Sequence, residues 1–93
     1  MRARKIDANQ NEIVKKLRKI GCSVSVTSAL GHGFPDLLVG YNGVNYLIEL
    51  KDGSKPPSQR NLTPLECEFI STWRGLISVC IDFESIIKLC GIN

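Results

Sequence analysis

The segment PDLLVGYNGVNYLIELK, residues 35–51, constrains the fold of this chain more than any other stretch. At its centre lies the dipeptide Asn42-Gly43, which is the strongest short sequence signal for a two-residue β-hairpin turn of type I′. A two-residue loop places Tyr41 opposite Val44, and the pairing of every later residue follows by counting outward from the turn.

Alternation along these two strands separates an apolar face from a charged one. The charged face carries Asp36, Glu49 and Lys51, and the register sets the two carboxylates directly opposite each other. Like charges in that position are destabilising, so a cation is expected between them. That cation could be the ammonium of Lys51, or it could be Mg²⁺, which prefers hard oxygen ligands. The alternative is an ordinary surface cluster in which Lys51 is the counter-ion. The other face, predicted to lie in the core, carries Leu37, Val39, Tyr41, Val44, Tyr46, Ile48 and Leu50.

Upstream of the hairpin the sequence predicts one helix and one strand. The helix is expected from about Asp7, a good N-cap, to Ile20, and Gly21 is a natural stop. Residues 22–29 alternate as a strand, and the glycines of residues 30–35 indicate a loop before the hairpin.

Downstream of the hairpin, a polar loop leads to a helix with a full start signature. Thr63 is the expected N-cap, Pro64 occupies the first helical position, and Glu66 completes a capping box. Gly75 is expected to end this helix.

The last elements complete a mixed fold. Residues 76–81 are an apolar stretch expected to form a buried strand, and residues 82–91 a short helix capped by Asp82 and stopped by Gly91. The order α-β-β-β-α-β-α predicts an α/β (α+β) fold with a mixed central sheet flanked by helices. At 93 residues the chain is expected to form one domain, residues 1–93.

Composition argues against membrane and metal-thiolate classes. No apolar run approaches the roughly 20 residues that a membrane span needs, and the N-terminus lacks the apolar core of an export signal. The cysteines, Cys22, Cys67, Cys80 and Cys90, have no zinc-site spacing. They are interpreted as four buried thiols of a protein in a reducing cytoplasm.

Positive charge is concentrated near the N-terminus. The net charge is only +3. Seven basic residues within the first 20 positions favour a polyanion as partner, although a solvated helix face explains the charge alone equally well. The basic residues in the first 20 positions are Arg2, Arg4, Lys5, Lys15, Lys16, Arg18 and Lys19.

The charged residues of the hairpin also carry a family resemblance. PD at 35–36, followed after twelve residues by ELK at 49–51, resembles the PD-(D/E)XK nuclease signature, and the element order is similar to that superfamily's restriction-endonuclease-like α-β-β-β-α-β core. The stretches DANQNEIVKKLRKIG, GFPDLLVG, IELKDGSKPPS and LTPLECEFISTWRG resemble small stand-alone phage and prophage proteins of the virus-type replication-repair nuclease (VRR-NUC) group. The resemblance spans roughly residues 7–81.

The resemblance implies Mg²⁺- or Mn²⁺-dependent hydrolysis of DNA phosphodiester bonds, in a bacterial or phage-infected host cell. It makes Asp36, Glu49 and the main-chain carbonyl of Leu50 metal ligands. It gives Lys51 the task of positioning or activating the attacking water and of offsetting charge on the phosphate.

The resemblance also directs attention to the first helix and to the loop after the hairpin. Glu12 matches the acidic residue on the family's first helix and would join the catalytic and metal-binding set; an i,i+4 pair with Lys16 is the alternative. Candidates for DNA contact are Lys15, Lys19, Lys55, Gln59 and Arg60.

Three functions remain open at this stage. The intact set of Asp36, Glu49 and Lys51 favours a metal-dependent, structure-selective DNA endonuclease, for example a resolvase of four-way junctions. The alternatives are a non-catalytic DNA-binding or assembly module that retains the fold, and a nonspecific nicking nuclease. Symmetric cutting of branched DNA would require a homodimer. The candidate interfaces are the helix with Phe69, Ile70 and Trp73, and the late segment SIIKLCGI.

Overall fold

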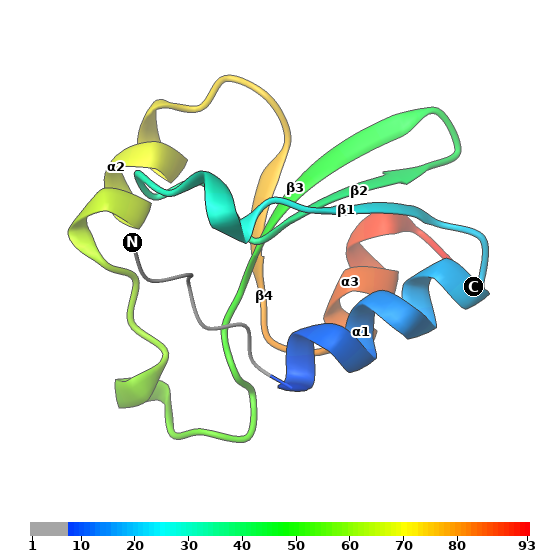
Figure 1. Ribbon diagram of the computed structural model, residues 1–93, viewed down its shortest axis with the longest axis horizontal. Coiled ribbons are helices and arrows are strands. Elements are labelled where there is room, and N and C mark those ends of the chain that lie inside the picture. Colours follow the sequence, from blue (N-terminus) through cyan, green and yellow to red (C-terminus); the bar gives the residue numbers. More distant parts are fainter. Residues whose placement is uncertain (1–7) are drawn as a thin grey trace.

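The computed structural model describes residues 8–93 as a four-stranded sheet with three α-helices and two short 3₁₀ turns (Figure 1). The helices are α1 (Ala8–Lys19), α2 (Pro64–Thr72) and α3 (Phe83–Cys90), and the strands are β1 (Ser23–Val26), β2 (Leu37–Tyr41), β3 (Val44–Leu50) and β4 (Ile77–Cys80). The strand order is β1-β2-β3-β4, antiparallel except for the parallel pair β3–β4. The predicted class, a mixed central sheet flanked by helices, is confirmed.

The β2–β3 hairpin has the register that its turn predicts. Asn42 and Gly43 both adopt positive φ, 51° and 79°, as a type I′ turn requires. Tyr41 pairs with Val44 beside the turn, and the ladder continues unbroken to the start of β2. The sequence therefore determines which side chains share a face of the sheet.

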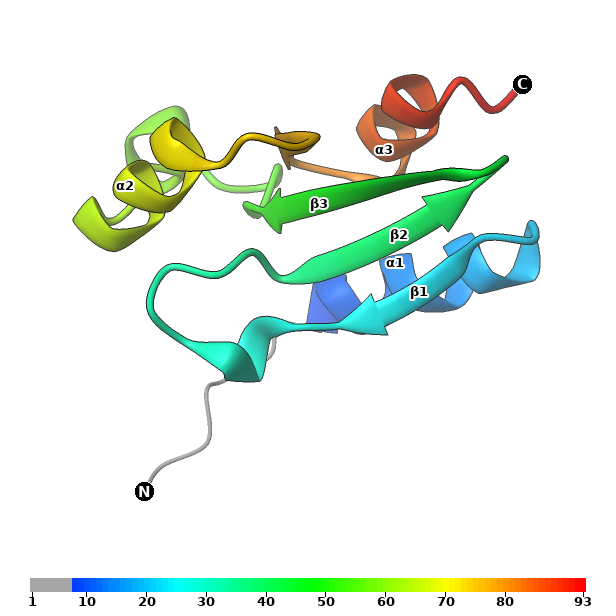
Figure 2. The same ribbon diagram turned by 90° about the horizontal axis from the view of Figure 1, so that it is seen from above.

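The core lies between one face of the sheet and the helices α1 and α3. Leu37, Val39 and Ile48 from the hairpin are fully buried there, against Leu17 of α1 and Ile86 of α3. Burial of each such side chain contributes about 1.5–3 kcal/mol. In Figures 1 and 2, α2 lies apart from these two helices, at the end of the hairpin where β2 begins and β3 ends.

The chain turns earlier after β1 than the sequence suggests. The strand ends at Val26, and Ser28–Leu30 form a 3₁₀ turn. Between them, Thr27 donates its hydroxyl to the carbonyl of Pro35 at 2.7 Å, which joins the two ends of the loop. The main-chain N–H of Thr27 also donates to the carbonyl of Asp36 at 2.8 Å, so both bonds of Thr27 close the loop between β1 and β2.

Two expectations for the C-terminal half need correction. β4 is an edge strand in which only Cys80 is buried, so it is not the buried strand that its apolar sequence predicts. The helix α2 ends at Thr72, before Gly75, because Trp73 turns to extended backbone and its N–H caps the helix. The indole of Trp73 then folds over Gly75, where a Cβ would lie 2.8 Å from its Nε1.

The helix termini otherwise follow the sequence signals. α3 begins at the N-cap Asp82 and ends at Gly91, which adopts φ 72° in the left-handed region. The expected N-cap of α1, Asp7, lies outside the described residues. No helix within residues 8–93 is long and apolar enough to cross a bilayer.

The expectation of four buried thiols is wrong for one of them. Cys22, Cys80 and Cys90 are buried, whereas Cys67 is exposed on α2, and all four are free. Burial raises the pKa of Cys90 to about 11, so this thiol stays neutral and packs as a small apolar side chain.

Candidate active site

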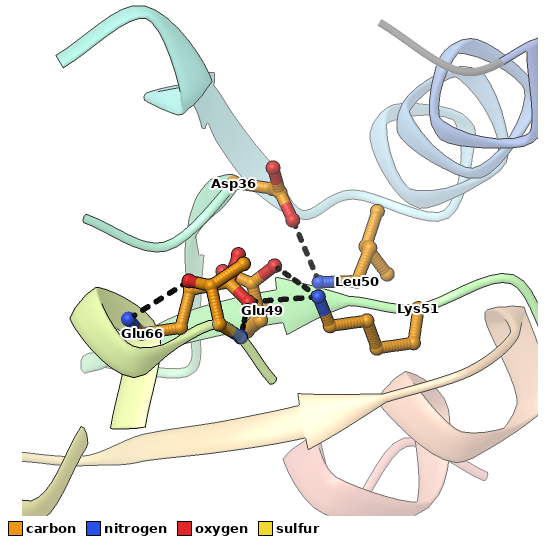
Figure 3. Close-up of polar contacts among 6 residues, drawn as sticks. Asp36, Glu49, Leu50, Lys51 and Glu66 are labelled. Atoms are coloured by element: carbon orange, nitrogen blue, oxygen red, sulfur yellow. Dashed lines mark hydrogen bonds and ion pairs between the residues drawn. The ribbon is translucent and has the colours of Figure 1, made fainter. Parts of the chain in front are cut away.

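Two carboxylates meet where β2 begins and β3 ends. Asp36 directly precedes β2 and is 6% exposed, and Glu49, near the end of β3, is 1% exposed. Oδ2 of Asp36 accepts a hydrogen bond from the main-chain N–H of Leu50 at 2.8 Å, which fixes this side chain across the two strands (Figure 3). The hairpin register has brought the two buried carboxyl groups into direct interaction.

Lys51 brings a positive charge to the same place. Its Nζ lies 3.7 Å from Oε2 of Glu49 and 2.8 Å from Oε1 of Glu66, which is the first acidic residue of α2. Glu66 is only 4% exposed. Figure 3 shows these side chains pointing toward one another from β3, α2 and the residue before β2. We call the four residues Asp36, Glu49, Lys51 and Glu66 the carboxylate cluster.

Glu66 also caps α2. Its Oε1 accepts the N–H of Thr63 at 2.9 Å, and its own N–H donates to Oγ1 of Thr63 at 3.2 Å, so the predicted capping box is present. The sequence indicates this capping role and nothing more. No sequence signal shows that the first turn of α2 packs against the end of β3, so the place of Glu66 in the cluster emerges only from the fold.

Glu49 has the most perturbed environment in the cluster. Burial, first of all, together with the carboxyls of Asp36 and Glu66, raises the pKa of Glu49 to about 9, against the opposing charge of Lys51. Oε1 of Glu49 is buried and has no hydrogen-bond partner among the described residues. A buried oxygen without a partner is destabilising, and a cation bound there would relieve both the desolvation and the repulsion.

Glu66 is perturbed in the opposite direction. Burial alone would raise the pKa of Glu66, but hydrogen bonds from the ammonium of Lys51 and from the N–H of Thr63 hold it below its ordinary value. At neutral pH Glu66 is therefore an ionised partner of Lys51, whereas Glu49 retains its proton in the absence of a metal.

The donor set fits a hard divalent cation. Asp36 and Glu49 offer buried carboxylate oxygens, and the unpartnered Oε1 of Glu49 is the observation that supports the fit. Within residues 8–93 no group of three or more His, Cys, Asp or Glu is placed so that it could hold a metal ion. The carbonyl of Leu50, water and substrate oxygens would have to complete the shell, as is usual for Mg²⁺.

The predicted residues of α1 do not reach the cluster. Glu12, Lys15 and Lys19 are all exposed, and Glu12 makes no hydrogen bond or ion pair in the described part of the chain. Lys16, its expected surface partner, instead lies over the ring of Phe83, 5.6 Å from the centroid. α1 packs on the apolar face of the hairpin, opposite to the face that carries the carboxylates.

The predicted residues of the loop between β3 and α2 are also separate from the cluster. Lys55 and Gln59 are exposed, and Arg60 is half-buried, with a buried Nε that has no partner among the described residues. No hydrogen bond or ion pair in the described part of the chain joins any of the three to the cluster. Their roles in DNA contact stay predictions.

The loop that leads to Asp36 is fastened to α2. Phe34 packs edge-on against Phe69 and Trp73, with centroids 5.0 and 6.4 Å away, and these two rings stack on each other at 5.2 Å. Gly33 has φ 79°, and a Cβ there would lie 2.3 Å from the carbonyl oxygen of Leu65. Only glycine permits so close an approach of the loop to the first turn of α2.

Fold and cluster together define a restriction-endonuclease-like domain, in which a mixed sheet flanked by helices presents carboxylates and a lysine at one end of its central hairpin. Among solved structures, the chain is similar to one described as a VRR_NUC domain, with a TM-score of 0.61, 27% sequence identity, and coverage of 86% of this chain and 87% of that one.

The comparison confirms the resemblance to the VRR-NUC group and indicates a nuclease of the PD-(D/E)XK type. The narrower resemblance to small phage and prophage proteins stays a prediction. No family model matches the chain, and no curated protein matches it.

Proposed function

We propose that this chain is a metal-dependent DNA endonuclease that hydrolyses phosphodiester bonds at the carboxylate cluster. The observation that carries the proposal is the buried pair of Asp36 and Glu49, with one unpartnered carboxylate oxygen, beside Lys51. Such a pair lowers the stability of the free protein, which is typical of a site kept for binding and chemistry. The likeness to a VRR_NUC domain supports a phosphodiester as substrate.

In the proposed reaction Asp36 and Glu49 would hold Mg²⁺ or Mn²⁺, and the metal would supply Lewis acidity and activate water for attack. The N–H of Leu50 orients Asp36. Lys51 places a positive charge beside the carboxylates, where it offsets the charge of the scissile phosphate and orients the attacking water. An ammonium has three donors, so Lys51 retains donors for water and phosphate after Glu66 accepts one.

The proposed substrate is DNA, including branched DNA such as four-way junctions, and a homodimer would cut two strands symmetrically. Of the two candidate interfaces, α3 already buries Ile86 and Cys90 in the core of its own chain. This favours the surface beside α2 as the interface. There Trp73 and Leu76 are 43% and 55% exposed around a shallow apolar groove of about 380 Å³. The free thiols suit a protein of the reducing cytoplasm.

A second candidate is a DNA-binding module without turnover. It is favoured by one observation: the exposed Glu12 contributes no third acidic ligand to the cluster within the described residues. The two candidates make opposite predictions for metal-dependent cleavage.

The test uses purified protein with labelled four-way junction, flap and linear DNA in Mg²⁺, Mn²⁺ or chelator. Cleavage that needs the metal and is lost in Asp36→Asn supports the endonuclease, and Glu68→Gln on the exposed face of α2 is the matched control. Equal cutting of all three DNAs would indicate a nonspecific nicking nuclease. DNA binding without any cleavage would indicate the non-catalytic module.

A further inference from the structure

Glu66 lies at the junction of two structural units. Its buried carboxylate is bonded on one side to the ammonium of Lys51 and on the other to the N–H of Thr63 at the start of α2. We infer that Glu66 is a positioning residue: it holds the ammonium of Lys51 beside Glu49 and so couples the reactive geometry to the docking of α2. This inference rests on the proposed function and deepens it.

The distances show which carboxylate holds the lysine. Nζ of Lys51 lies 2.8 Å from Oε1 of Glu66 but 3.7 Å from Oε2 of Glu49, so the hydrogen bond is made to Glu66. Lys51 follows the last residue of β3, and its flexible four-carbon stem defines no direction by itself. Without Glu66, the side chain of Lys51 would exchange between conformations in which its ammonium faces Glu49 and conformations in which it faces solvent.

Glu66 is itself held by the packing of α2. An ideal Cβ on Gly33 would lie 3.0 Å from the N atom of Glu66, which shows how closely the loop approaches the first helical turn. One turn further along α2, Phe34 of the same loop packs against Phe69. Since this loop continues directly into Asp36, a single docked surface sets the positions of both Asp36 and Glu66.

The competing role for Glu66 is that of a third metal ligand. Its Oε1 already accepts two hydrogen bonds, from Lys51 and from Thr63. A cation bound at this oxygen would displace the ammonium and the helix cap together. At Oε1 the geometry therefore favours positioning over ligation, and the two roles differ in their effect on metal affinity.

The central variant is Glu66→Gln. Glutamine has nearly the same shape and keeps a carbonyl oxygen that accepts the N–H of Thr63, so α2 stays capped. It removes the charge that holds Lys51. The matched control, Glu68→Gln, removes one negative charge from an exposed position of the same helix.

We expect Glu66→Gln to lower kcat about 10- to 100-fold, as loss of an orienting partner typically does, with KM for DNA unchanged. Its Mn²⁺ affinity, measured by calorimetry, should match that of the wild type. Glu68→Gln should change none of these quantities. Loss of Mn²⁺ binding in Glu66→Gln would overturn the inference, because it would make Glu66 a ligand.

A second readout does not depend on cleavage. In nitrogen-15 NMR spectra of lysine side chains at low temperature, the bonded ammonium of Lys51 should give a signal protected from solvent exchange. Lys51→Arg assigns the signal by removing it. The signal should persist in Glu68→Gln and vanish in Glu66→Gln. If the wild-type protein cuts no DNA, the proposed function fails while this test of the Lys51–Glu66 contact still stands.

If Glu66→Gln does not fold, a second variant tests the same contact. Glu66→Asp keeps a negative charge at the start of α2, where it suits the helix dipole, but it is one methylene shorter. The Lys51 signal and full kcat should both be lost in this variant as well. Retention of the protected signal and of full kcat in either variant would reduce Glu66 to a helix cap and overturn the inference.

Discussion

Glu49→Gln should abolish a specific pH dependence of stability in metal-free buffer. The pKa of Glu49 is raised from 4.5 to about 9 in the folded protein by burial and by the neighbouring carboxyls of Asp36 and Glu66, with Lys51 opposing. The contribution of the Glu49 carboxyl to the stability of the folded protein is therefore fully present below about pH 4.5, and it is lost as the pH rises through about 9. Glutamine has nearly the same shape but does not titrate, so the variant lacks this loss.

The size of the effect follows from proton linkage. Between the two pKa values the unfolded chain binds one proton fewer at Glu49 than the folded chain, and the free energy of unfolding falls by up to about 1.4 kcal/mol per pH unit. From about pH 6 to about pH 8 the wild type should lose roughly 3 kcal/mol relative to Glu49→Gln. For a domain of this size that difference corresponds to a shift of roughly 10–20 °C in Tm.

Urea unfolding of both proteins in chelator, at several pH values in this window, measures the effect. The exposed Glu68→Gln serves as control and should follow the wild-type slope. The other residues of the carboxylate cluster are present in both proteins, so the difference between the two curves reports the titration of Glu49 together with its coupling to Asp36 and Glu66. Parallel curves for the wild type and Glu49→Gln would refute the account of a buried, protonated Glu49.

Two further outcomes are expected. Gly33→Ala should lower the free energy of unfolding, measured in urea titrations, by at least about 1–3 kcal/mol, because its φ of 79° is strained for alanine and the new Cβ would overlap the carbonyl of Leu65. Gly43 also has positive φ, but the space around it is open, so Gly43→Ala is the control. An equally large loss in Gly43→Ala would contradict the argument from close approach. Mn²⁺ at about one hundred times its Kd should raise the stability of the wild type by about 2.7 kcal/mol in thermal melts; an equal rise in Asp36→Asn would remove Asp36 from the metal site.

The hairpin and its two carboxylates were predictable because the relevant information is local. The pair Asn42-Gly43 specifies a turn with positive φ at both positions, and a two-residue turn leaves one register for the strands beside it. Once the register is fixed, side-chain alternation brings Asp36 and Glu49 together without any knowledge of the remaining fold.

The role of Glu66 was not predictable because it depends on tertiary packing. The capping box of Thr63 and Glu66 predicts the start of a helix, and the structure confirms that start. The approach of that helix to Lys51, however, requires the loop at Gly33 to dock on α2, and these segments lie more than thirty residues apart in the sequence. A capping pattern carries no information about what lies on the other side of the carboxylate.

The exposure of β4 was hidden for a related reason. Its apolar sequence is typical of a central strand, but hydrophobic content does not reveal which strand lies at the edge of a sheet. Within residues 8–93 β4 pairs with β3 alone, and Leu76 and Val79 are 55% and 41% exposed. An exposed apolar edge of this kind is a natural site for contact with a partner.

Metal-dependent cleavage tests the central claim most directly. Wild-type protein is incubated with end-labelled DNA in Mn²⁺, beside the variants Asp36→Asn and Glu49→Gln and beside a sample in chelator. The account predicts cut products with wild type and metal, and none with chelator or with either variant, although circular dichroism shows all three proteins folded. Cleavage that continues in chelator, or that is undiminished in both folded variants, would contradict the assignment of the reaction to the carboxylate cluster.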